Sequence, residues 1–145
     1  MGDILHRVGF EATPAKVYAA LPSVDGLAGW WTSDTSGAGD GTLIFRFGEV
    51  GGFDMKVVEL RPDKRVLWEV IDGPVELVGT TVSFELVQED EWTIVLFTHA
   101  GWAEPVEFMN HCSTKWATFL MSLKSLVETG TGAPHPSDVQ ISNWH

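Results

Sequence analysis

The sequence predicts a single α+β domain in which a curved antiparallel sheet wraps around one long C-terminal helix. Three observations lead to this prediction. The chain has 145 residues, which is about the size of one domain. Apolar and polar residues alternate in several segments between residues 4 and 99, as is typical of strands joined by short turns. Apolar residues then recur at three- and four-residue steps over residues 109–127, as is typical of an amphipathic helix.

The chain is expected to begin with one strand and two short helices. Residues 4–10 alternate as a strand does. Thr13 is placed to cap a first helix that starts at Pro14, where the missing N–H is harmless, and that stops at Pro22. Ser23 is placed to cap a second short helix, which its glycines weaken.

Five further strands are expected after a polar loop. Residues 33–41 are rich in Gly, Ser and Asp and read as a loop. The alternating segments after it are residues 42–47, 53–58, 66–71, 80–87 and 92–99, and a turn over residues 48–52 separates the first two of these segments. Together with the first strand, they predict a six-stranded antiparallel sheet.

The last regular element is a long amphipathic helix, expected between Pro105 and Gly130. The sheet has one apolar face, and this helix is the element able to cover it. The sheet is therefore expected to curve around the helix in the helix-grip architecture, with residues 1–130 as a single domain.

Residues 131–145 are expected to form a C-terminal tail that packs on the domain or extends from it. The segment has too much Gly, Pro and Ser for regular structure. Val139, Ile141 and Trp144 are the apolar residues that could pin it to the domain.

Composition and charge exclude several classes of partner. Nine Lys and Arg against twenty Asp and Glu give a net charge of −11, which repels nucleic acid and anionic membranes. No apolar run approaches the ~20 residues of a membrane span, so no membrane insertion is expected. Polar residues interrupt the N-terminus where a signal peptide would be apolar, so we expect a cytoplasmic location. Cys112 is the single cysteine, which excludes an internal disulfide.

A high aromatic content points to a cavity between the sheet and the long helix. The chain has seven tryptophans and eight phenylalanines, and aromatic residues lie on one face of nearly every expected strand. We expect a small hydrophobic ligand in that space. The expected wall residues are Trp30, Trp31, Phe45, Phe53, Met55, Trp68, Phe84, Phe97, His99, Trp102, Met109, Trp116 and Phe119.

Trp30 and Trp31 stand side by side in the stretch "GLAGWWT" on the second short helix. Neighbouring helical residues point about 100° apart, so one ring can line the cavity while the other packs elsewhere. The alternative is that both rings simply plug the open end. The order of elements places the pair at the mouth between the sheet and the long helix.

His99 and Glu59 are the candidate polar residues of the cavity. His99 shares a strand face with Val95 and Phe97, and it is either a hydrogen-bonded core histidine or a polar group that projects into the cavity. Glu59 ends an apolar strand face and is the weaker candidate. Catalysis would need a proton donor within about 3 Å of the reacting atom, and no catalytic motif accompanies these residues.

The remaining histidines predict neither a metal site nor a cofactor. His111 and Cys112 are adjacent on the helix and face different directions, and the spacings to His99 and His135 match no metal site. No phosphate-binding glycine loop is present, so no cofactor is expected.

The chain resembles the START-like, birch-pollen-allergen-like (SRPBCC) superfamily, and within it the homologues of the activator of heat shock protein 90 ATPase. The resemblance is carried by "EATPAKVYAAL", "GLAGWW", "ELRPDKRVLWE", "TTVSFELV", "WTIVLFTHAGW" and "KWATFLMSLKSLVETG". It implies a hydrophobic cavity, which in different members holds lipids, sterols, polyketides or plant hormones. It also implies relatives that cyclise or hydrate such ligands.

Binding of a small hydrophobic ligand is therefore the leading functional hypothesis. One alternative is a cyclase-like or hydratase-like enzyme, with His99 as general acid or base and Glu59 assisting. The other is a co-chaperone-like interaction module. The co-chaperone branch of the family acts through an additional N-terminal domain, and this chain starts at the first strand, which argues against a chaperone partner. A homodimer through an edge strand or the long helix is also possible.

Overall fold

The computed structural model describes residues 2–48 and 51–145 and has the predicted α+β architecture. The predicted turn over residues 48–52 includes Glu49 and Val50, which lie outside the described residues. The elements are β1 (Gly2–Phe10), α1 (Pro14–Ala19), α2 (Val24–Trp30), β2 (Asp34–Gly37), β3 (Thr42–Arg46), β4 (Gly52–Arg61), β5 (Arg65–Asp72), β6 (Thr81–Glu89), β7 (Trp92–Trp102) and α3 (Glu107–Thr129).

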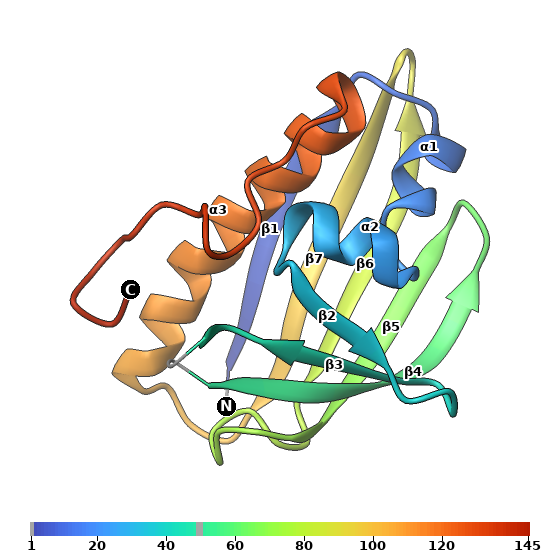
Figure 1. Ribbon diagram of the computed structural model, residues 1–145. Helices are drawn as coiled ribbons and strands as arrows, with labels where there is room; N and C mark the ends of the chain where they lie inside the picture. The colour runs from blue at the N-terminus through green and yellow to red at the C-terminus, as the bar shows by residue number, and fades with distance from the viewer. Residues whose placement is uncertain (1, 49–50) are drawn as a thin grey trace.

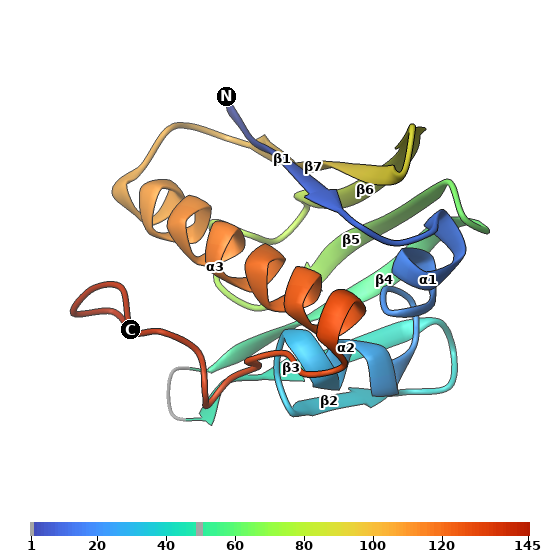
Figure 2. The same cartoon turned by 90° about the horizontal axis from the view of Figure 1, so that it is seen from above.

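The strands form one antiparallel sheet that wraps around α3. Over the described residues the sheet has seven strands in the order β1-β7-β6-β5-β4-β3-β2, so the first strand pairs with the last (Figure 1). Seen from above, α3 lies along the concave side of this sheet, and α1 and α2 lie near the C-terminal end of α3 (Figure 2). Two register shifts between β4 and β5 bend these strands, as bulges do in curved sheets. The helix-grip architecture predicted from the order of elements is confirmed.

The seventh strand, β2, lies in the segment predicted to be a loop, and that prediction is wrong. Residues 34–37 pair antiparallel with β3, from Asp34 opposite Arg46 to Gly37 opposite Leu43. This strand is at the edge of the sheet and buries almost nothing, so it needs backbone hydrogen bonds and no apolar alternation. A polar edge strand of this kind carries no periodic signal in the sequence.

The two short helices begin at the predicted caps. The Thr13 hydroxyl accepts a hydrogen bond from the Lys16 N–H, and the Ser23 hydroxyl accepts one from the Gly26 N–H. Gly26 also has a packing role, because a Cβ atom there would stand 2.7 Å from the carbonyl oxygen of Ala20. Glycine thus lets α2 pack directly against the end of α1.

The long helix ends as predicted, and the tail after it folds back onto the domain. Gly130 takes the left-handed conformation (φ 89°) that ends many helices. Beyond it, His135 forms a parallel bridge with Thr32, and its N–H donates to the Trp31 carbonyl oxygen at 2.8 Å. Gly132 passes so close to Gly29 that a Cβ atom would lie 2.3 Å from the Gly29 carbonyl oxygen.

Polar contacts hold the tail more than the predicted apolar ones do. Val139 is 64% exposed and Trp144 is 44% exposed, whereas the side chain of Asp138 is buried.

No helix within residues 2–48 and 51–145 combines the length and the apolar character that a membrane crossing requires.

Candidate ligand-binding cavity

A cavity of about 490 Å³ lies between the sheet and the N-terminal half of α3. Its wall comes from the residues that directly follow α2 and β3, from β4, β5, the β5–β6 connection, β7 and α3, and from the tail. Most of these side chains are apolar or aromatic. The described lining residues are Trp31, Phe47, Gly51, Gly52, Phe53, Met55, Val70, Pro74, Glu76, Leu77, His99, Phe108, His111, Cys112, Lys115, Trp116, Phe119, His135, Asp138, Trp144 and His145.

The predicted wall residues divide between this cavity and the packed core beside it. Those that line the cavity are Trp31, Phe53, Met55, His99, Trp116 and Phe119. Those that do not line it are Trp30, Phe45, Trp68, Phe84, Phe97, Trp102 and Met109. Rings in this second group pack against one another instead: Phe84 lies edge-on to Trp68 at 5.2 Å and to Phe97 at 5.3 Å between centroids.

Trp30 and Trp31 are both buried, and they have different surroundings. Their rings stack at 5.6 Å between centroids, 11° from parallel. Trp30 is fully buried in the core, where its indole N–H donates to the Ala20 carbonyl oxygen at 2.8 Å. Trp31 packs against Trp116 at 4.8 Å and lines the cavity. Trp31 closes its side of the cavity with only 2% of its surface exposed, so one ring of the pair lines the cavity while the other packs in the core.

His99 is both hydrogen-bonded and exposed to the cavity, so the two alternatives for this residue coexist. An indole nitrogen can only donate, so the bond of 3.0 Å from Trp116 makes His99 Nδ1 an acceptor. His99 Nε2 then carries the proton and donates to the Thr80 hydroxyl at 2.8 Å. Thr80 in turn donates to the Leu77 carbonyl oxygen at 2.6 Å. This chain of hydrogen bonds joins α3 to β7 and to the β5–β6 connection.

Burial keeps His99 neutral. Loss of contact with water lowers the pKa of His99 from 6.5 to about 4, and the negative charge of Asp3 opposes this only in part. A neutral imidazole with both nitrogens engaged acts as a fixed polar contact and a structural link. A general acid–base role for His99 stays a prediction.

Two other residues singled out in the sequence have clear surroundings. Glu59 does not line the cavity; its carboxylate pairs with Arg61 at 2.6 Å and with Arg65 at 3.2 Å. These hydrogen bonds, that to Arg61 first, lower the pKa of Glu59. Cys112 does line the cavity, and burial raises the pKa of its thiol to about 12. The thiol is therefore an unreactive part of the wall.

Comparison with known proteins agrees with this architecture. The family described as "Activator of Hsp90 ATPase homolog 1-like protein" matches residues 11–128, which is most of the chain. The chain belongs to this family. Among curated proteins, none is significantly similar to the chain.

The same fold is found in solved structures of other proteins. The Aha1 dimer from Colwellia psychrerythraea is 49% identical, with a TM-score of 0.83 over 91% of this chain and all of that one. DynU16, a protein of the dynemicin biosynthetic locus, is 22% identical with a TM-score of 0.75, and the match covers 94% of this chain and 49% of DynU16. SSP2350 from Staphylococcus saprophyticus is 15% identical with a TM-score of 0.72 over 99% of this chain and all of that one.

The polar residues at the outer part of the cavity were missed in the sequence. His111 and Lys115 come from α3, while His135, Asp138 and His145 come from the tail. The tail lies beyond residue 128, where the family match ends. Irregular segments give no periodicity, so the sequence carries no signal that these tail side chains meet. The family resemblance carries none either.

Proposed function

We propose that this member of the Aha1-like family binds a small hydrophobic ligand between the sheet and α3. The observation that carries the proposal is the cavity of about 490 Å³, which falls within the roughly 300–1,000 Å³ of small-molecule sites. Family membership supports it, because the fold is one that commonly holds hydrophobic ligands. Burial of the ligand's apolar surface would provide the binding free energy, at about 25 cal/mol per Å².

The two ends of the cavity favour an amphipathic ligand. Trp31 and Trp116 form an apolar inner end, and both rings are buried. His111 and Lys115 lie in the wall toward the tail and provide polar contacts. The ligand would place its apolar part against the tryptophans and its polar part near the tail.

A cavity-filling variant tests the proposal. Cys112→Phe adds a ring on the α3 face that lines the cavity, while Met121→Phe adds one on the same helix at a residue that is 50% exposed. We expect tryptophan quenching and native mass spectrometry to show saturable binding of at least one probe among oleic acid, a sterol and 1-anilinonaphthalene-8-sulfonate. Cys112→Phe should weaken that binding at least about tenfold, and Met121→Phe should leave it unchanged.

Two results would contradict this function. The first is that the wild-type protein binds none of these probes saturably. The second is that Cys112→Phe binds them as the wild type does, because the bound probe would then lie outside the cavity. Circular dichroism of each variant separates a filled cavity from a misfolded domain.

We also propose that the protein forms a homodimer. The support is the Colwellia structure, which is described as a dimer and is 49% identical to this chain. Size-exclusion chromatography with light scattering tests this directly, and a monomer mass at concentrations up to about 100 µM would contradict it.

A further inference from the structure

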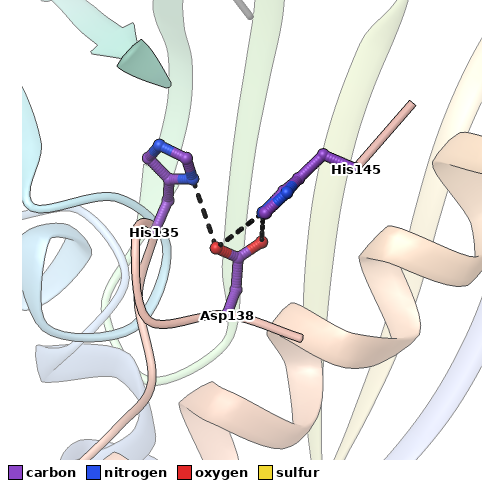
Figure 3. A group of neighbouring side chains, drawn as sticks. All are labelled: His135, Asp138 and His145. Carbon is purple, nitrogen blue, oxygen red and sulfur yellow. Dashed lines mark hydrogen bonds and ion pairs between the residues drawn. The ribbon is translucent and has the colours of Figure 1, made fainter. Parts of the chain in front are cut away.

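Three side chains of the tail meet at the edge of the cavity. Figure 3 shows His135, Asp138 and His145 pointing toward one another. His135 Nδ1 lies 3.2 Å from Asp138 Oδ1. His145 Nε2 lies 3.4 Å from the same oxygen and 3.3 Å from Oδ2. One ligand atom from each residue can be chosen so that all three lie within 4.8 Å of one another.

The donor atoms of this cluster suit a divalent transition-metal ion. Imidazole nitrogen and carboxylate oxygen bind zinc at about 2.0–2.2 Å, so two ligands of a tetrahedral ion lie about 3.4 Å apart. The nitrogen-to-oxygen distances of 3.2 and 3.4 Å match that spacing. The two imidazole planes are 82° apart, so the rings approach the carboxylate without stacking. His145, with a side chain 33% exposed, has room for the small rotation that would complete the geometry.

The surrounding structure holds the ligands in place. The Asp138 side chain is 1% exposed, and the Lys115 ammonium donates to its Oδ2 at 2.5 Å and to the Val139 carbonyl oxygen. Lys115 holds Oδ2, and Oδ1 lies within 3.4 Å of a nitrogen of each imidazole, so Oδ1 is the oxygen best placed to bind the ion. The backbone of His135 is tied to Thr32.

We propose that His135, Asp138 and His145 form a binding site for a divalent transition-metal ion of the zinc type. Three protein ligands leave at least one coordination position, and all three residues line the cavity. That position is available to water or to an oxygen atom of a molecule in the cavity. The sequence spacing predicted no metal site, and the fold creates this one by bringing the chain end back to His135.

The site does not depend on the hydrophobic-ligand proposal. A metal ion could bind with the cavity otherwise vacant, so failure of either proposal leaves the other standing. The nearby Lys115 ammonium repels a cation and opposes binding, while the protein's net charge of −11 favours it. We therefore expect a dissociation constant of about 1 µM rather than the far tighter values of closed structural zinc sites.

Metal titration of the full chain tests the proposal. The protein is freed of any affinity tag, stripped with chelator and titrated with Zn²⁺ by calorimetry and with Co²⁺ by visible absorption. We expect one ion per chain and cobalt bands of four- or five-coordinate intensity. His145→Ala, His135→Ala and Asp138→Asn should each weaken binding at least about tenfold.

His111→Ala is the matched control. His111 lines the same cavity and bonds to Ser142 of the tail at 3.1 Å, but it is not in the cluster. Its removal disturbs the tail without removing a ligand, so its metal affinity should stay within about threefold of the wild type. If Asp138→Asn misfolds, His145→Ala still tests the metal site. His145 is the most exposed of the three side chains, so its removal should disturb the fold least. The proposal is overturned if the wild type shows no saturable binding or if His145→Ala binds the metal as tightly.

Discussion

The two ends of the helix grip use the same sheet and the same long helix, yet one is packed solid and the other holds a cavity. At the end covered by α1 and α2 (Figure 2), Leu21, Leu27 and Trp30 are all fully buried. At the other end the irregular tail forms part of the cavity wall. A cavity in this fold therefore depends on what is inserted between sheet and helix, and aromatic content alone does not create it.

The two ends also differ in their titratable groups. At the packed end the indole N–H of Trp30 donates to a backbone carbonyl group, and none of the described buried side chains there is titratable. The cavity end gathers His99, His111, Lys115 and the tail cluster. Stability should thus depend most on the packed end, while pH and ligands should act at the cavity end.

Trp30→Ala tests the packed end and should have the largest effect on stability. The change removes a fully buried ring and its 2.8 Å hydrogen bond to Ala20. Large-to-small changes of this kind cost about 3–5 kcal/mol of unfolding free energy. Urea unfolding measures the loss, and a cost below about 1 kcal/mol would show that this end is not tightly packed.

A pH titration of stability tests the cavity end through His99 and should give the next largest effect. The pKa of His99 is about 4 in the folded protein against 6.5 when unfolded, so the unfolded chain takes up the proton first. The contribution of His99 is complete above pH 6.5 and is lost as the pH falls to about 4. Between pH 7 and 4.5 the wild type should lose about 2–3 kcal/mol more unfolding free energy than His99→Gln.

Glutamine is the suitable replacement because it is neutral, donates and accepts hydrogen bonds, and does not titrate. Carboxylates titrate in the same range in both proteins, so the difference between the two pH profiles isolates His99. Parallel profiles would contradict the buried neutral imidazole.

The fold could be predicted from the sequence where an element buries one face, because burial of one face gives its apolar residues a regular spacing. Thr13 and Ser23 gave the helix starts, Gly130 gave the helix end, and alternation gave six of the seven strands. The strand at residues 34–37 was missed because an edge strand buries almost nothing. The spacing of apolar residues reveals elements that bury one face. It does not reveal a strand that is held in the sheet by backbone hydrogen bonds alone.

The cavity was only partly predictable for a related reason. Residue type and position on a strand or helix identified Trp31, His99 and Trp116 as facing inward, but the same logic included Trp30 and Phe84, which pack in the core. A face pattern shows which side chains point inward and does not show how far the space beyond them is filled. The tail cluster depends on a chain reversal between residues 130 and 145, which no local pattern encodes.

Trp144→Ala completes the comparison and should have the smallest effect on stability. Trp144 is 44% exposed and contacts Phe108 and His111 over the cavity wall. Removal of a partly exposed tail residue should cost less than about 1 kcal/mol of unfolding free energy. It also removes part of the cavity wall, so stopped-flow fluorescence should show faster association of a hydrophobic probe than in the wild type. A loss of more than about 2 kcal/mol, or an unchanged association rate, would mean that the tail belongs to the core and does not control access to the cavity.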